Sequence, residues 1–245
     1  MQRLQLNIAD VPVALLAGGL ATRLGNVSAT IPKAMVDVAG RPFIDHQLLL
    51  LRSRGIRRIV LCLGHLGQQI EQHLGDGASC GLSLSYSHDG PTLVGTGGAL
   101  RRAMPMLGPV FWVMYGDSYM DIDYRAVLAR FADSDAGGLM TVIRNDDCWD
   151  RSNAVFEEGR LSCYDKIHRT PDMRYIDYGV QLLRASAVES LLTQERCDLA
   201  DIYRTMVSQG RMIGHEVHDR FYEIGTPAAL EETRRHLATP ARVSA

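Results

Sequence analysis

The sequence Val11-Pro-Val-Ala-Leu-Leu-Ala-Gly18-Gly19 decides the fold of this 245-residue chain. An apolar run that ends in two glycines is typical of a buried parallel strand followed by a tight turn. The glycines let the backbone come close to a ligand and expose its N–H groups. Arg23 and Lys33 follow, and their guanidinium and ammonium groups suit phosphate oxygens. The stretch therefore predicts a strand, a turn and two cations that together hold a triphosphate.

Strands and helices alternate through the first half of the chain. The continuous apolar run Val110–Tyr115 predicts a central buried strand. The alternation predicts a parallel sheet with helices on both faces. Besides the opening strand and 110–115, we expect strands at 56–63 and 82–86, and helices at 42–54, 68–74, 97–104 and 124–132.

The pattern changes near Gly137, where short strands joined by turns become frequent. Strands are expected at 138–144, 154–157, 161–165 and 175–183, with closing strands at 212–217 and 221–224. Helices are expected at 185–192, 199–209 and 227–237. No internal repeat and no long linker divides the chain, which predicts one domain over residues 1–245.

Composition excludes several classes of protein. The net charge of −2 gives no overall field for nucleic acid or for an anionic membrane, so no partner of either kind is expected. No apolar run reaches the length of a membrane span, and the first ten residues lack the features of a signal peptide. Five scattered cysteines without a C-x-x-C pair favour free thiols in a reducing compartment. We therefore expect a cytoplasmic protein.

The string Gly18-Gly19-x-x-Thr22-Arg23-Leu24, followed by Pro32-Lys33, resembles the signature of the sugar-1-phosphate nucleotidyltransferases, also called NDP-sugar pyrophosphorylases. The family's usual third glycine falls at Ala21. The resemblance implies a three-layer α/β/α Rossmann-like fold of the GT-A type, with a mostly parallel central mixed sheet. It also implies a nucleotide-binding half at about 1–136, a sugar-binding half at about 137–238, and a flexible tail at 239–245.

The resemblance implies that two glycine-rich turns bind the nucleotide. The second turn, Gly95-Thr96-Gly97, resembles the family's base-binding turn, although glycine turns before helices are common in other proteins. The nucleotide-binding residues implied are Leu16, Ala17, Gly18, Gly19, Thr22, Arg23, Gly95, Thr96 and Gly97.

Two acids are implied as ligands of Mg²⁺. Asp117 follows the central strand and Gly116, where a carboxylate points into the crevice that binds ligands in such sheets. Glu223 stands where the family has an aspartate before Ile-Gly. From the residues alone, Asp117 could instead cap a turn, and Glu223 could be an ordinary acid at a strand end. Asp121 and Asp123 are expected to cap the helix near Tyr124.

Two stretches of the second half are implied to face the sugar. Lys166 falls where relatives have a lysine that contacts the sugar phosphate, and Asp165 stands beside it in place of the usual glutamate. A solvated strand end is an equal alternative for Asp165, and a buried paired acid is an alternative for Asp177. The implied sugar-binding residues are Tyr115, Gly116, Asp165, Lys166, Asp177, Tyr178 and Gly179.

The resemblance implies an enzyme that joins a sugar 1-phosphate to a nucleoside triphosphate and releases pyrophosphate, by Mg²⁺-dependent in-line attack on the α-phosphate. Arg23, Lys33, Asp117 and Lys166 would be its catalytic residues. GTP is favoured, because the string most resembles the D-glycero-D-manno-heptose 1-phosphate and mannose 1-phosphate guanylyltransferases. A monomer or a homodimer is expected.

Three alternatives stay open. The first is a uridylyl- or cytidylyltransferase of the same family. The second is a non-catalytic sugar-nucleotide-binding regulatory protein, which the departures at Ala21 and Glu223 would suit. The third is a dinucleotide-binding oxidoreductase, which is disfavoured because Gly18-Gly19-Leu20-Ala21 does not match G-x-G-x-x-G.

Overall fold

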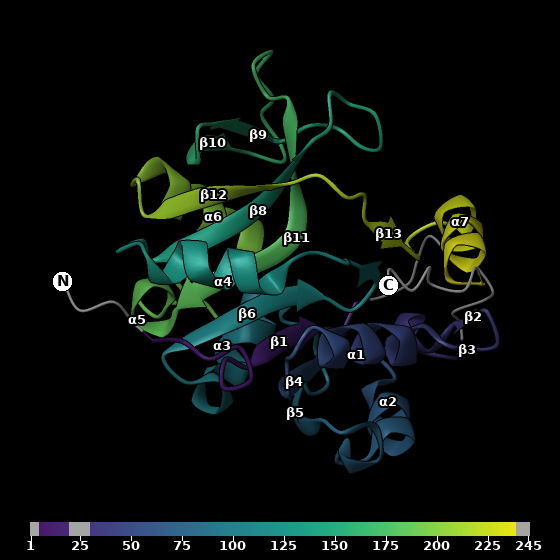
Figure 1. Ribbon diagram of the computed structural model, residues 1–245. Helices are drawn as coiled ribbons and strands as arrows, with labels where there is room; N and C mark the ends of the chain where they lie inside the picture. Colours follow the sequence, from purple (N-terminus) through teal and green to yellow (C-terminus); the bar gives the residue numbers. More distant parts are fainter. Residues whose placement is uncertain (1–4, 20–29, 239–245) are drawn as a thin grey trace.

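The computed structural model describes residues 5–19 and 30–238 of the chain, so the expected tail at 239–245 lies outside the described residues (Figure 1). Within those ranges one nine-stranded sheet has the order β5-β4-β1-β6-β11-β8-β12-β10-β9. Its strands are β1 Val13–Leu16, β4 Arg58–Leu63, β5 Ser83–His88, β6 Val110–Tyr115, β8 Gly138–Arg144, β9 Ala154–Glu157, β10 Arg160–Tyr164, β11 Tyr175–Arg184 and β12 Met212–Val217.

The sheet is mixed, as expected, but parallel pairing prevails only in its first half. Strands β5, β4, β1 and β6 are all parallel, with β1 in the middle between β4 and β6. Strand β11 is antiparallel to both β6 and β8, and the β9 and β10 pairings are also antiparallel. The expectation of a mostly parallel sheet therefore holds for residues 13–115. Beyond them β8 and β12 are parallel to each other, but the other pairings are antiparallel.

Helices cover both faces of the sheet. Successive side chains of the buried strands point to opposite faces, and on each face they form a separate hydrophobic core with the helices. Val13 and Leu15 pack with the helices on one face, whereas Ala14 packs with those on the other. The first face carries α1 Phe43–Ser53, α2 Gly67–Leu74 and α4 Tyr124–Ala132. The second carries α3 Gly95–Leu107, α5 Ala185–Val188 and α6 Leu199–Ser208. Figure 1 shows α4 in front of the sheet.

Two short pairings were not predicted from the sequence. The expected closing strand at 221–224 does not join the large sheet: β13, Tyr222–Glu223, pairs instead with β7, Ser118–Tyr119, in an antiparallel ribbon. Strands β2, Asp37–Val38, and β3, Arg41–Pro42, form a second small hairpin. The helix expected at 185–192 is shorter, ending at Val188. Periodicity does not reveal strands of two residues, since they are too short to show one.

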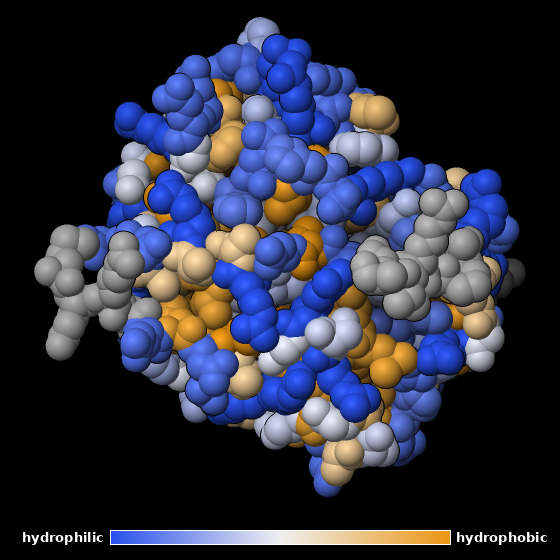
Figure 2. All heavy atoms as spheres, in the orientation of Figure 1, coloured by the Kyte–Doolittle hydropathy of each residue, from blue (hydrophilic) through white to orange (hydrophobic). Residues whose placement is uncertain are grey.

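The last helix, α7 Pro227–Ala238, lies beside the large sheet next to β13 (Figure 1). A third, small core formed by Val36, Val38, Phe43, Ile224 and Leu230 joins it to the β2–β3 hairpin and α1. No helix in the described ranges has the length and apolar character needed to cross a bilayer. Figure 2 shows a mainly hydrophilic face on which apolar residues appear in scattered groups.

An ion pair also holds α7 to the segment before β13. Both terminal nitrogens of Arg220 donate to Glu232, at 2.6 and 2.8 Å. The Arg220 guanidinium lies over the rings of Trp149 and Tyr222, at 5.7 and 5.1 Å from their centres. Tyr222 in turn stacks on His236 of α7, with ring centres 3.7 Å apart. Arg220 therefore connects three separate segments of the chain.

We expect Glu232→Gln to lower the free energy of unfolding by about 1 kcal/mol, because a bidentate charged pair is lost from a site that solvent partly screens. The matched control is Glu231→Gln, whose pair with Arg234 is longer, at 3.7 Å, and should contribute less than about 0.5 kcal/mol. Urea unfolding of the three proteins measures both changes. Equal effects of the two substitutions would contradict this role of Arg220.

The same pair predicts a pH dependence. Hydrogen bonds from Arg220 lower the pKa of Glu232 below its ordinary value of 4.5. A carboxyl whose pKa is lowered by folding stabilises the protein above its ordinary pKa, and that contribution is lost as the pH falls through the lowered value. The stability difference between wild type and Glu232→Gln should thus be constant near neutral pH and shrink below pH 4.5. A difference unchanged in acid would show that the carboxylate charge is not its source.

Candidate functional site

A cavity of about 270 Å³ opens at the carboxyl ends of β1 and β6. Its wall is formed by the residues after β1, the start of α3, the end of β6 and Lys33. Among the sequence-predicted residues, this places together Leu16, Ala17, Gly18, Gly19, Lys33, Gly95, Thr96, Tyr115, Gly116 and Asp117. The predicted residues Thr22 and Arg23 lie outside the described residues.

Close backbone contacts explain why glycines stand at the strand ends. A Cβ added to Gly18 would lie 2.8 Å from the backbone nitrogen of Gly64, which follows β4. A Cβ on Gly116 would lie 2.8 Å from the Cβ of Ala17. A separation below 3.0 Å forces the backbone to shift, so these positions accept only glycine without rearrangement. The Gly18 turn is therefore held against its neighbours as well as facing the cavity.

Asp117 and Lys33 form an ion pair at the cavity wall. The Lys33 Nζ donates to Asp117 Oδ2 at 2.6 Å, and the Ser118 hydroxyl donates to Oδ1 at 3.1 Å. The Lys33 side chain is 16% exposed and that of Asp117 is 35% exposed, so both charges remain within reach of a ligand. The pair brings a cation from the first loop to the acid that follows β6.

Gln47 supports the turn that carries Asp117. Its side-chain amide is buried and donates to the carbonyl oxygens of Tyr115 and Ser118, each at 2.8 Å. These two bonds fix the backbone on both sides of Gly116 and Asp117. Sequence reasoning missed Gln47, although a polar residue on the apolar side of an amphipathic helix was a usable signal.

Glu223 lies next to Asp117 through the β7–β13 ribbon. Glu223 pairs with Ser118, and the Ile224 N–H donates to the Asp117 carbonyl at 3.0 Å. The ribbon thus brings the backbone at Glu223 beside the backbone at Asp117. Of these two acids, Asp117 lines the cavity and Glu223 is not among its described lining residues. In the described ranges no group of three or more His, Cys, Asp or Glu could hold a metal ion. The Asp117 carboxylate at the cavity suits a Mg²⁺ that takes its other ligands from water or phosphate.

The second glycine turn has a structural partner besides the cavity. The Thr96 hydroxyl donates to Asp198 at 3.1 Å and accepts from the Leu199 N–H at 2.8 Å, so it caps the start of α6. A Cβ on Gly97 would lie 2.6 Å from the sulfur of Cys197, and the Gly97 N–H donates to the Cys197 carbonyl at 2.9 Å. The turn is packed against residues 195–199, and Gly95 and Thr96 also line the cavity.

The predicted sugar-facing acids both have partners within the protein. Asp165 Oδ1 accepts from the N–H groups of His168 and Ile167, at 2.9 and 2.7 Å. These bonds lower the pKa of Asp165 to about 2. Asp177 is 3% exposed and accepts three hydrogen bonds from neighbouring groups. The alternative of a buried, paired acid therefore describes the Asp177 carboxylate in this structure.

Lys166 links this region to the cavity. Its Nζ lies 5.9 Å from the centre of the Tyr115 ring, and Tyr115 lines the cavity. Burial, with Asp177 as a second cause, raises the pKa of Tyr115 well above its ordinary value, so the phenol stays neutral. Gly179, with φ of +96°, approaches the same ring, since a Cβ there would lie 3.5 Å from Tyr115 Cδ2.

Among the cavity residues that sequence reasoning missed, two have a titratable side chain. Asp89 follows β5, is 5% exposed, and has its pKa raised chiefly by burial, although Arg102 opposes this. Cys62 lines the cavity from β4 and is buried. The position of Asp89 at the carboxyl end of a parallel strand was a usable signal. Asp123 caps α4 as expected, whereas Asp121 pairs with Arg54 instead.

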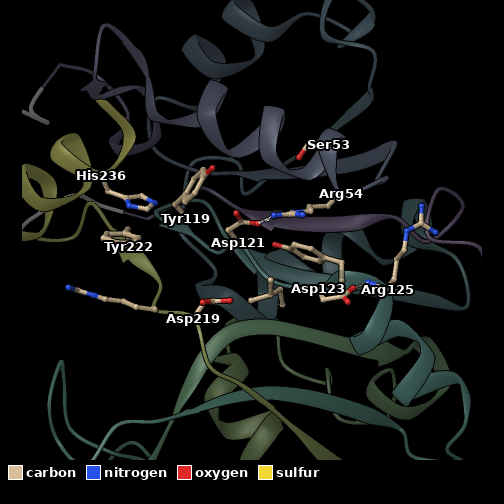
Figure 3. Close-up of a pocket in the computed structure, with 12 residues that line it drawn as sticks. Ser53, Arg54, Tyr119, Asp121, Asp123, Arg125, Asp219, Tyr222 and His236 are labelled. Atoms are coloured by element: carbon tan, nitrogen blue, oxygen red, sulfur yellow. Dashed lines mark hydrogen bonds and ion pairs between the residues drawn. The ribbon is translucent and has the colours of Figure 1, made fainter. Parts of the chain in front are cut away.

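A larger cavity of about 630 Å³ lies between the end of α1, the start of α4, the β7–β13 ribbon and α7. Figure 3 shows Tyr119, Tyr222 and His236 gathered at one side of it, with Arg54 and Asp121 joined across its wall. Two of the three arginines that line it among the described residues, Arg54 and Arg220, are already paired with acids. We assign the functional site to the smaller cavity, because the glycine turns and the Lys33–Asp117 pair converge there.

Comparison with known proteins adds a family match. The model of the family described as "Nucleotidyl transferase" matches residues 13–157, which is more than half of the chain. The chain is 29% identical to an N-acetylmuramate alpha-1-phosphate uridylyltransferase of Neisseria meningitidis serogroup B, over 90% of this chain and 95% of that protein. It is 24% identical to a D-glycero-alpha-D-manno-heptose 1-phosphate guanylyltransferase of Campylobacter jejuni, over 87% of this chain and 94% of that protein.

The fold has solved counterparts. The crystal structure of HddC from Yersinia pseudotuberculosis superposes with a TM-score of 0.77, covering 93% of this chain and 99% of that one at 24% identity. This likeness extends over both halves of the sheet.

The glycine geometry gives a prediction with a matched control. Gly18→Ala should cost about 1–3 kcal/mol of stability, because its Cβ would collide with the Gly64 backbone. Gly19→Ala should change stability by less than about 0.5 kcal/mol, since a Cβ at Gly19 meets no atom of the described residues within 4 Å. Thermal unfolding of both variants checks this. The same loss in both would contradict the close contact of Gly18 with Gly64.

Proposed function

We propose that this chain, which belongs to the nucleotidyl transferase family, transfers a nucleotidyl group from a nucleoside triphosphate to a sugar 1-phosphate and releases pyrophosphate. The observation that carries the proposal is the Lys33–Asp117 pair, which faces a cavity walled by the Gly18 and Gly95 turns. A cation, an acid and two glycine turns suit a polyphosphate and its metal ion. The names of the two sequence relatives support the reaction class.

The first half of the chain would bind the nucleotide and the second half the sugar phosphate. This division, within one domain of three layers, is supported by the cavity, because all of its described lining residues fall between Leu16 and Asp117. Lys166, from the second half, borders it across Tyr115. We place the reaction in the cytoplasm, without nucleic acid or membrane partners, and expect a monomer or a homodimer.

The chain's own residues would supply alignment and charge, which phosphoryl-type transfer chiefly requires. Lys33 would leave its pair with Asp117 to donate to the α-phosphate, and Lys166 would orient the attacking sugar phosphate. Arg23, from the sequence signature, would steady the departing pyrophosphate. Asp117 and Glu223 would hold Mg²⁺, which when bound there neutralises phosphate charge. The reaction needs no covalent intermediate on the protein.

GTP and UTP are the two leading triphosphates. The sequence string favours GTP, and the heptose guanylyltransferase relative supports it. The uridylyltransferase relative has the higher identity of the two, which supports UTP as a second candidate. A panel of GTP, UTP, CTP and dTTP against several sugar 1-phosphates with Mg²⁺, read by pyrophosphate release, tests the proposal. Failure of every pair would favour the non-catalytic, sugar-nucleotide-binding alternative.

We expect Asp117→Asn and Arg23→Ala each to slow pyrophosphate release on the order of 100-fold or more while the fold persists, because each removes a charge from the reacting centre. Asp121→Asn is the matched control: its carboxylate pairs with Arg54 at the other cavity, and turnover should stay near that of wild type. Circular dichroism verifies folding of all three. Near-normal turnover of Asp117→Asn would reject its assigned role.

A further inference from the structure

We propose that Gln181 and Tyr164 fix the buried carboxylate of Asp177, and that this carboxylate positions Lys166 for the phosphate of the sugar substrate. The inference deepens the proposed function and rests on it, since it takes Lys166 as the phosphate-binding cation. In this view Asp177, Gln181 and Tyr164 are positioning residues that act through Lys166. They take the place of a direct contact between Asp177 and sugar hydroxyls.

The Asp177 carboxylate is held on both of its oxygens. Oδ1 accepts from Gln181 Nε2 at 2.6 Å and from the Gly179 N–H at 3.0 Å. Oδ2 accepts from the Tyr164 hydroxyl at 3.2 Å. With a side chain only 3% exposed, the carboxylate depends on these donors, because a buried charge without partners is costly. Few of its lone pairs remain for a substrate.

A bulge in β11 brings the side chains of Gln181 and Asp177 within hydrogen-bonding distance. Residues four apart in a regular strand share a face but stand about 13 Å from each other along it. The pairing of β11 with β8 shifts register between Asp177 and Gln181, and Gly179 there adopts φ of +96°. The shift brings the Gln181 amide to the Asp177 carboxylate. A residue other than glycine at 179 would be strained in that conformation.

Gln181 is oriented by a further partner. It is fully buried, and its Oε1 accepts from the Tyr203 hydroxyl at 3.4 Å. An ionised carboxylate only accepts hydrogen bonds, so the amide must present its NH₂ group to Asp177 and its oxygen to Tyr203. The order Tyr203, Gln181, Asp177 therefore has one consistent direction of donation.

Lys166 stands where this network ends. Its Nζ lies 3.8 Å from Asp177 Oδ2, and its side chain is 44% exposed. The ammonium thus has the fixed carboxylate on one side and the Tyr115 ring, at 5.9 Å, beside it, while another side stays open. A lysine side chain is flexible, so a fixed counter-charge selects the conformers that lie at the cavity edge. The ammonium is then oriented before an anionic substrate arrives.

The test removes one donor at a time. Gln181→Met deletes the amide bond to Oδ1 with little change in volume, and Tyr164→Phe deletes the hydroxyl bond to Oδ2. Tyr124→Phe is the matched control, since its buried hydroxyl bonds only to the Met120 carbonyl on the other face of the sheet. We expect Gln181→Met and Tyr164→Phe to raise KM for the sugar 1-phosphate about five- to tenfold, and to leave KM for the triphosphate unchanged. Tyr124→Phe should alter neither KM.

A double-mutant cycle separates positioning from general damage. If Gln181 acts through Lys166, then Gln181→Met should add less than about twofold in a Lys166→Ala background. A full additional effect in that background, or equal effects from Tyr124→Phe, would overturn the proposal. Thermal unfolding of every variant shows whether it folds, and Tyr164→Phe, which removes a single atom, decides the matter if Gln181→Met does not fold.

A second measurement does not depend on turnover. Titration of inorganic phosphate by calorimetry, across the same cycle, reports the anion site of Lys166 directly. We expect Lys166→Ala and Gln181→Met each to weaken phosphate binding, with no further loss in the double variant. If no substrate pair reacts but this cycle holds, the proposed reaction fails and the positioning role stands. If phosphate binding does not depend on Lys166, the positioning proposal fails by itself.

Discussion

The antiparallel pairing of β7 with β13 is the constraint on which the candidate site depends. Two residues on each side join the segment after the central strand to a segment about a hundred positions later. Through it, Glu223 comes next to Asp117, and Ile224 enters the small core that seats α7. Tyr119 and Tyr222 of the same ribbon also line the larger cavity. Hydrophobic burial builds the sheet, but this ribbon brings the backbone at Glu223 to the turn that carries Asp117.

Much of the fold could be predicted from the sequence, because long apolar periods report buried elements. The ranges of β6, α4, β8 and β12 match the expectations to the residue. The β7–β13 ribbon could not be predicted, since two-residue strands have no period and their partner is far away in the chain. The sequence also predicted parallel pairing too widely. Apolar patterns show where strands lie, whereas the direction of each strand relative to its neighbours depends on the connections between them.

The candidate site shows a similar division. Residue type and spacing predicted the glycine turns, Lys33 and Asp117, because backbone approach and charge are properties of single positions. Whether an acid is available to a ligand is a property of its surroundings. Other groups of the protein form hydrogen bonds with Asp165, Asp177 and the Thr96 hydroxyl. No local sequence pattern predicts those partners. Gln47 and Gln181 were missed because their importance lies in what they donate to.

Cys62 has a consequence for chemical probes of this protein. It lines the candidate cavity, yet burial, with Asp89 as a second cause, raises the pKa of its thiol to about 12. Only the thiolate form of a cysteine reacts readily with electrophiles. Because the pKa of the Cys62 thiol is raised to about 12, almost no thiolate forms there at neutral pH. A ligand of this cavity that bears an acrylamide or chloroacetamide would therefore lie beside this sulfur without alkylating it. Covalent labelling would fall instead on the exposed Cys148, which is not among the described lining residues of this cavity.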